Sequence, residues 1–83
     1  MRKKVYVRVW SETSPEGKVT PLSLEWINGQ RFQIDKVLEC RQAVPKGVDI
    51  SDTSIRYTIM LYGQRRLLYR EEKTNRWFVV VEP

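Results

Sequence analysis

An Asn-Gly pair flanked by two alternating segments is the feature that most constrains the fold of this chain. Asn28 and Gly29 both tolerate the positive φ angles that a two-residue type I′ hairpin turn requires. Apolar and polar side chains alternate over residues 22–26 before the pair and over residues 31–35 after it. A shift of one residue in the pairing would exchange the apolar and polar faces, so we expect a firmly set register. The pattern therefore predicts a β-hairpin.

Similar alternation recurs along the chain and predicts six antiparallel strands. The expected strands, including the two of the hairpin, cover residues 4–12, 18–27, 30–43, 55–62, 66–71 and 76–81. Tight turns join most of them, which predicts a single all-β domain over residues 1–83, folded as a six-stranded meander, a bent sheet or an SH3-like, partly open barrel. The expected core residues are Val5, Val7, Val9, Leu22, Leu24, Trp26, Phe32, Ile34, Tyr57, Ile59, Leu61, Trp77 and Val79.

The third expected strand changes phase along its length. Phe32 and Ile34 share one face, whereas Val37 falls on the other. We interpret the change either as a β-bulge near Asp35-Lys36, which would let a small sheet turn a corner, or as a stretch covered on both faces.

We also make predictions for two segments, residues 37–44 and residues 45–54. A short helix over residues 37–44 is an alternative to the strand, because the apolar residues also fit helical spacing, although no N-cap residue introduces it. Residues 45–54 are rich in turn formers and are expected to form a flexible loop.

Cysteine usage and apolar run lengths bear on location. Cys40 is the single cysteine among the 83 residues, so an internal disulfide is impossible, and we expect a reducing, cytoplasmic setting. No apolar run approaches the ~20 residues of a membrane-spanning helix, so we expect no membrane partner. Arg8 interrupts the apolar residues after the basic start of the chain, which favours a first strand over a signal peptide.

The residue types argue against an enzyme. There is no histidine, which removes the commonest general base and metal ligand. Cys40 lies in an apolar alternation and is expected to be a buried core residue. Two acidic residues, Asp49 and Asp52, fall in the expected loop, where they favour turns, and each glycine stands alone at an expected turn. We therefore expect no catalytic residue, no metal and no cofactor.

Basic and aromatic residues favour a binding role. Fifteen Lys and Arg against ten Asp and Glu give a net charge of +5. Arginines interleaved with exposed rings are typical of surfaces that bind single-stranded nucleic acid. The candidate residues for such a surface are Tyr6, Arg8, Trp10, Arg31, Arg56, Tyr62, Arg66 and Arg70.

Two alternatives remain open for these residues. The rings of Tyr6 and Trp10 would also suit cross-strand pairs or a second small core on a bent sheet. The same composition would suit a protein partner, since aromatic residues and arginine dominate interface hot spots. A module of this kind would be a monomer or a homodimer.

Three sequence stretches also carry a resemblance. They are Trp26-Ile-Asn-Gly29-Gln-Arg-Phe32-Gln-Ile34-Asp-Lys-Val37-Leu38, Arg56-Tyr57-Thr58-Ile59 and Trp77-Phe78-Val79. In this pattern the chain resembles a group of short bacterial β-rich proteins of unknown function, in which a Trp-x-x-Gly-x-x-aromatic-x-Ile hairpin precedes a basic, aromatic second half. The resemblance covers nearly the whole chain and transfers no catalytic residue. It implies an association with genes for lesion-bypass DNA polymerases.

Overall fold

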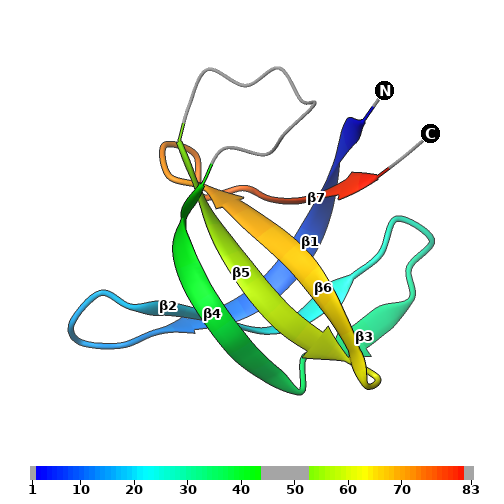
Figure 1. Cartoon of the computed structure of the whole chain (residues 1–83), viewed down its shortest axis with the longest axis horizontal. Coiled ribbons are helices and arrows are strands. Elements are labelled where there is room, and N and C mark those ends of the chain that lie inside the picture. The colour runs from blue at the N-terminus through cyan, green and yellow to red at the C-terminus, as the bar shows by residue number, and fades with distance from the viewer. Residues whose placement is uncertain (1, 44–52, 82–83) are drawn as a thin grey trace.

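The structure, a computed structural model, describes residues 2–43 and 53–81 and consists of antiparallel β-strands in one strongly curled sheet (Figure 1). The strands are β1 (Lys3–Thr13), β2 (Val19–Glu25), β3 (Arg31–Gln33), β4 (Lys36–Ala43), β5 (Ser54–Leu61), β6 (Gln64–Glu71) and β7 (Trp77–Val81). Their order across the sheet is β3-β2-β1-β7-β6-β5-β4. The all-β class and the partly open barrel are confirmed, with seven strands in place of the expected six.

The extra strand arises because the expected third strand breaks at a corner between β3 and β4. The Ile34 N–H donates to the Leu22 carbonyl at 3.0 Å, and the next N–H, that of Asp35, donates to the Met60 carbonyl at 2.9 Å. The chain thus leaves β2 and joins β5 within two residues. Because β3 and β4 are the two edges of the sheet, this corner brings the edges together and curls the sheet into a barrel.

The long strand β1 joins the two halves of the sheet. Its first part pairs with β7, from Lys3 opposite Val81 to Val7 opposite Trp77, and its second part pairs with β2. The register with β2 shifts after Trp10, which leaves Leu22 as an extra residue on β2. Leu22 is consequently 40% exposed, so its expected place in the core is wrong. The bulge could not be recognised from alternation alone, since a bulge reverses the face of the residues beyond it.

Two hairpin turns differ from expectation. At the Asn28-Gly29 pair only Gly29 has a positive φ, 87°, and the Gly29 N–H donates to the Trp26 carbonyl at 2.9 Å. This is a three-residue turn ending in a glycine bulge, not the expected type I′ turn. The three-residue turn places Leu24 opposite Phe32, so the apolar faces of the two arms coincide, whereas a two-residue turn at Asn28-Gly29 would place Leu24 opposite Gln33. A two-residue turn with positive φ at both positions does occur, but at Tyr62 and Gly63, between β5 and β6.

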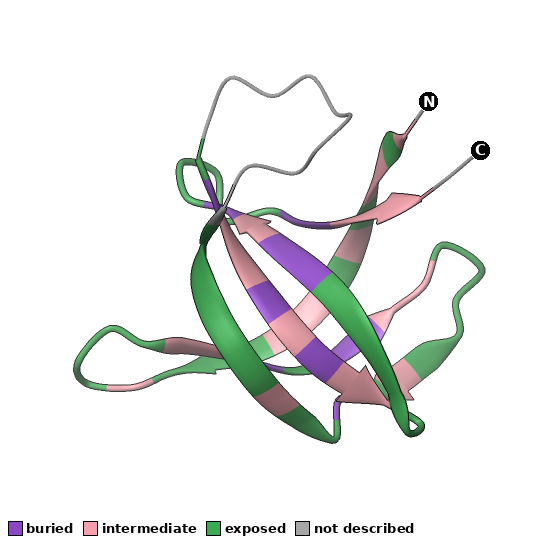
Figure 2. Ribbon diagram, in the orientation of Figure 1, coloured by how far each residue is buried: buried purple, intermediate pink, exposed green. Residues whose placement is uncertain are grey.

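The core fills the concave side of the curled sheet. Its buried members are Leu24, Ile34, Tyr57, Ile59, Leu68 and Trp77. Half-buried side chains pack around them, namely Val7, Val9, Val19, Phe32, Val37, Ile55, Leu61 and Val79. Most of the expected core residues are among these, whereas Val5 and Trp26 are half-buried outside that cluster. Figure 2 shows the buried residues of the strands on β2, β5, β6 and β7.

Two further expectations, both about residues of the edge strand β4, are wrong. Residues 36–43 form a strand, so the helical alternative is wrong. The phase change has two sources, the corner at Ile34–Asp35 and a bulge at Leu38, where the register with β5 shifts. Cys40 is exposed, not buried, because it lies on the outermost strand of the sheet. Most of the expected loop 45–54, with Asp49 and Asp52, lies outside the described residues, while Ser54 begins β5.

Candidate functional site

The eight candidate residues do not form one surface. Tyr6 joins an aromatic cluster on the convex side of the sheet with Tyr69 and Phe78. Its ring packs edge-on against Phe78 at 5.9 Å between centroids, and Phe78 stacks on Tyr69 at 5.1 Å. Phe78 is fully buried and Tyr69 is 5% exposed, so this cluster is a second small core. The structure therefore matches the alternative interpretation of Tyr6.

An ion pair beside this cluster ties β1 to the end of β6. Glu71 accepts hydrogen bonds from the Lys4 ammonium at 2.8 Å and from the Tyr6 hydroxyl at 2.6 Å. The Thr74 hydroxyl donates to its other oxygen at 2.6 Å. Burial alone would raise the pKa of the Glu71 carboxyl, but the bonds from Lys4, Thr74 and Tyr6 outweigh burial and lower the pKa to about 2.

Three candidates meet on the convex side of β1, β2 and β3. The Arg31 guanidinium lies 3.9 Å above the centre of the Trp10 ring, and the Arg8 guanidinium lies 5.1 Å from it. Arg31 also donates to the Ser23 hydroxyl at 3.3 Å. Because a guanidinium already covers the Trp10 ring, these contacts account for the three residues as cross-strand packing.

Two other arginines are engaged within the fold. Arg56 lies 3.4 Å from the carboxylate of Glu39, on the convex side of β4 and β5. Arg70 donates to the Tyr57 hydroxyl at 3.4 Å and to the Asn75 side chain at 3.0 Å. Both cations thus have polar partners that compete with an external ligand.

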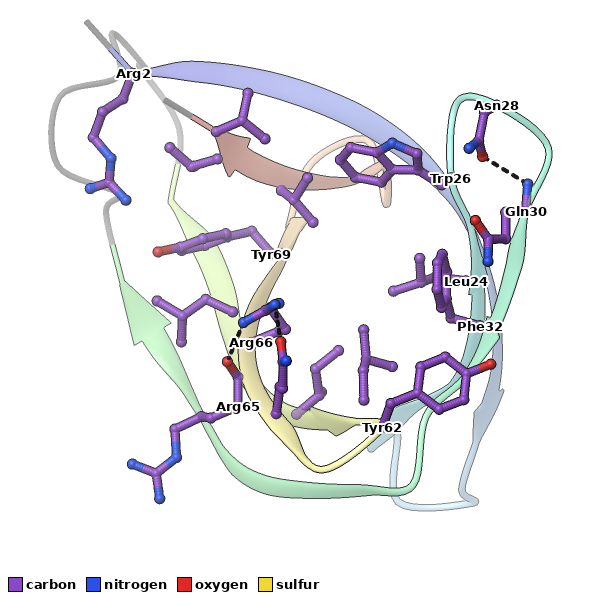
Figure 3. A pocket seen from close by; sticks show the side chains of 17 residues that line it. Arg2, Leu24, Trp26, Asn28, Gln30, Phe32, Tyr62, Arg65, Arg66 and Tyr69 are labelled. Carbon is purple, nitrogen blue, oxygen red and sulfur yellow. Dashed lines mark hydrogen bonds between the residues drawn. The ribbon is translucent and has the colours of Figure 1, made fainter. Parts of the chain in front are cut away.

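The remaining two candidates, Tyr62 and Arg66, line a cleft of about 970 Å³ (Figure 3). The cleft opens where β6 and β7 separate, because these strands pair only at Tyr69 with Phe78 and at Arg70 with Trp77. Beyond those pairs the end of β7 and the start of β6 diverge, and both contribute to the lining. The β2–β3 hairpin forms the opposite wall.

The lining of this cleft is aromatic and basic. Its aromatic residues are Trp26, Phe32, Tyr62 and Tyr69, and its arginines are Arg2, Arg65 and Arg66. None of the described residues that line it carries a carboxylate. Within the described ranges, neither Arg65 nor Arg66 forms an ion pair with an acidic side chain; Arg66 donates to Gln64 and to the Arg65 carbonyl. The cleft therefore presents Arg65 and Arg66 without a carboxylate among its described lining residues.

Tyr62 is held at the rim of the cleft by the turn between β5 and β6. Its φ of 48° places it in the left-handed region, which a bulky side chain rarely occupies. The side chain is 69% exposed, and its ring contacts Phe32 edge-on at 5.7 Å between centroids. An aromatic ring is thus presented to solvent beside the arginines, in a conformation that is unfavourable for the backbone.

Sequence reasoning missed most of the cleft. Trp26 and Phe32 are among the expected core residues, and Arg65 precedes the expected strand 66–71 and is not among the candidates. The adjacent pair Arg65-Arg66 after a predicted turn was the available signal. Its significance depends on the separation of β6 from β7, which strand alternation does not encode.

No protein-family model, curated protein or solved structure matches this chain. The resemblance to short bacterial β-rich proteins and the finer likeness to an SH3 barrel therefore stay predictions. In the described part of the chain no helix is long and apolar enough to cross a membrane. The same residues contain no cluster of metal-binding side chains.

Proposed function

We propose that this protein is a non-enzymatic module that binds single-stranded nucleic acid in the cleft between β6, β7 and the β2–β3 hairpin. The observation that carries the proposal is the position of Arg65 and Arg66, which form no ion pair within the described residues, beside the exposed Tyr62 ring in a cleft whose described lining has no carboxylate. Guanidinium groups bind phosphates with paired, charge-assisted hydrogen bonds, and aromatic rings stack on bases. The net charge of +5 favours approach of a polyanion.

The size of the cleft favours a single strand over a duplex. Its volume of about 970 Å³ is near the upper end of pockets that hold one small molecule. Such a space accommodates a few unstacked bases, which only a single strand offers freely. Tyr62 and Phe32 would contact the bases, while Arg65 and Arg66 would contact the phosphates. The exposed Cys40 thiol is compatible with a reducing, cytosolic location, which we include in the proposal.

The test is fluorescence anisotropy with a labelled single-stranded oligonucleotide and the matching duplex, at low and moderate salt. We expect the single strand to bind more tightly than the duplex. Reversal of one charge in the cleft, Arg65→Glu or Arg66→Glu, should weaken binding by about tenfold, since each removes a phosphate contact and adds repulsion. Arg8→Glu changes the net charge equally on the convex side and should weaken binding by less than about threefold.

If the cleft variants and Arg8→Glu lost the same affinity for the single strand, the cleft would not be the binding site. Absence of binding at low salt would contradict the proposal altogether. In that case a protein partner, including a homodimerising adaptor, becomes the better hypothesis, and binding by an apolar protein interface would respond little to salt.

A further inference from the structure

The edge strand β4 presents a long accessible edge that the proposed function does not use. β4 is the last strand of the sheet and pairs with β5 alone among the described strands. Its residues from Lys36 to Gln42 are exposed, apart from the half-buried Val37, as Figure 2 shows in green. A groove of about 410 Å³ lies between residues 36–40 of β4 and residues 18–22 at the start of β2, and β4 forms no strand pairing with β2.

Symmetry restricts how such an edge can pair with a second copy of itself. Two identical antiparallel strands related by a two-fold axis place one residue opposite its own copy, and its neighbours opposite each other in reverse order. Registers centred on Glu39 or on Arg41 place like charges directly opposite, which is unfavourable. The register centred on Cys40 instead places Glu39 opposite the Arg41 of the second copy, and does so twice.

We propose that the β4 edge pairs antiparallel with the β4 edge of a second copy of this chain, about a two-fold axis at Cys40. The side chains of Glu39 and Arg41 are 49% and 58% exposed and form an ion pair of 3.2 Å within one copy, which the pairing would exchange for two ion pairs between copies. Leu38, which is 42% exposed at the bulge, adds apolar surface near the pairing. The strand interaction is a form of β-augmentation, in which backbone hydrogen bonds supply affinity and side chains supply register.

The dimer and the cleft are separate features. β4 contributes no residue to the lining of the cleft, and its free edge lies on the side of β4 away from β5. The dimer would therefore carry two accessible clefts. The inference does not depend on the ligand of the cleft, and its test uses no nucleic acid.

Cys40 supplies a direct reporter of the register. Directly opposite residues in an antiparallel pair have Cα atoms about 4.5–5.5 Å apart, which is within the range that a disulfide spans. Added diamide takes two electrons and two protons from the two Cys40 thiols, forming the disulfide while it is reduced to the hydrazine. In the wild type we expect a reversible dimer in sedimentation equilibrium at high micromolar concentration, and rapid covalent dimer formation with diamide.

Two charge variants test the register. Arg41→Glu places glutamates opposite each other, and Glu39→Arg places arginines opposite each other, so each variant alone should form the covalent dimer about tenfold more slowly. An equimolar mixture of the two variants should recover the wild-type rate and yield the mixed dimer, because both cross-strand pairs are again of opposite charge. Recovery in the mixture also shows that both variants are folded.

Arg8→Glu, at a distant convex position, serves as the control and should form the covalent dimer at the wild-type rate. A wild-type chain that remains monomeric up to millimolar concentration would overturn the proposal. So would variants that form the covalent dimer as fast alone as in the mixture, because the register would then be irrelevant.

Discussion

Tyr62 combines an unfavourable backbone conformation with an exposed aromatic ring. Its φ of 48° and the φ of 75° at Gly63 form a turn whose first position is normally occupied by Asn or Gly. An observed backbone outlier of this kind at a cleft is a reason to infer a functional demand on the side chain.

We therefore predict that Tyr62→Asn stabilises the fold and weakens nucleic-acid binding. Asn tolerates the left-handed backbone conformation better than Tyr, so the substitution should raise the free energy of unfolding by about 0.5–1 kcal/mol, measured by chemical denaturation. Anisotropy should show weaker binding, because the stacking ring is lost. Tyr62→Phe keeps both the ring and the backbone strain and should change neither quantity. If Tyr62→Asn bound as tightly as the wild type, the ring would have no part in recognition.

Glu71 makes stability depend on acid pH. Its pKa is lowered from 4.5 to about 2, as the hydrogen bonds from Lys4, Thr74 and Tyr6 outweigh the effect of burial. Because the folded-state value lies below the unfolded value, the stabilisation is complete above about pH 4.5 and is lost as the pH falls toward 2. Denaturation at pH 7 should show Glu71→Gln less stable than the wild type by about 2 kcal/mol, with the difference shrinking toward pH 2.

The exposed neighbour Glu72 provides the control for this prediction, and Glu72→Gln should leave most of the acid transition in place. A Glu71→Gln variant whose stability fell with acid as steeply as that of the wild type would show that other carboxyls govern the transition.

At the scale of the elements, Tyr57 joins strands that are not neighbours in the sheet. Its hydroxyl, carried by β5, donates to the Val19 carbonyl of β2 at 3.0 Å and accepts from Arg70 of β6 at 3.4 Å. Burial raises the pKa of the Tyr57 hydroxyl, although Arg70 opposes the shift, so the hydroxyl keeps its proton at neutral pH. The hydrogen bond to Val19 thus connects β5 to β2, two strands that the sheet does not pair.

Removal of that hydroxyl by Tyr57→Phe should lower the free energy of unfolding by about 1–2 kcal/mol, because the Val19 carbonyl and the Arg70 side chain both lose a partner. Hydrogen exchange should also become faster in β2. Tyr69→Phe removes the hydroxyl of another largely buried tyrosine, and that hydroxyl has no hydrogen-bond partner in the described ranges, so the substitution should cost less. If the two variants lost the same free energy of unfolding, the hydrogen bond from Tyr57 to the Val19 carbonyl would contribute nothing beyond the loss of a hydroxyl.

At the scale of the whole molecule, the placement of charge matters more than its sum. The convex side pairs several cations with rings or carboxylates, whereas Arg65 and Arg66 in the cleft form no ion pair within the described residues. Binding through Arg65 and Arg66 predicts that the logarithm of the association constant falls with the logarithm of salt with a slope of about −1.4.

The neutral variant Arg65→Gln should reduce the size of this slope by about 0.7, the contribution of one phosphate contact to a single strand. A salt titration of anisotropy measures both slopes, with Arg8→Gln as the control. An unchanged slope in Arg65→Gln would place the phosphate contacts elsewhere on the molecule.

The sequence by itself determined the class of fold and most of the strands. Alternation is a local property, so it placed the β2–β3 hairpin and assigned Tyr57, Ile59 and Trp77 to the core. It failed at Leu22 and Cys40, because one bulge changes the face of a residue and the edge of a sheet leaves a residue uncovered.

The cleft was decided only by the tertiary structure. It exists because β6 and β7 pair over two positions and then diverge, while the corner at Ile34–Asp35 carries the β2–β3 hairpin round to face them. These are contacts between residues far apart in the chain, which no local pattern records. The sequence therefore predicted arginines and aromatic rings in a β-domain, and the curvature of the sheet decided which of them meet.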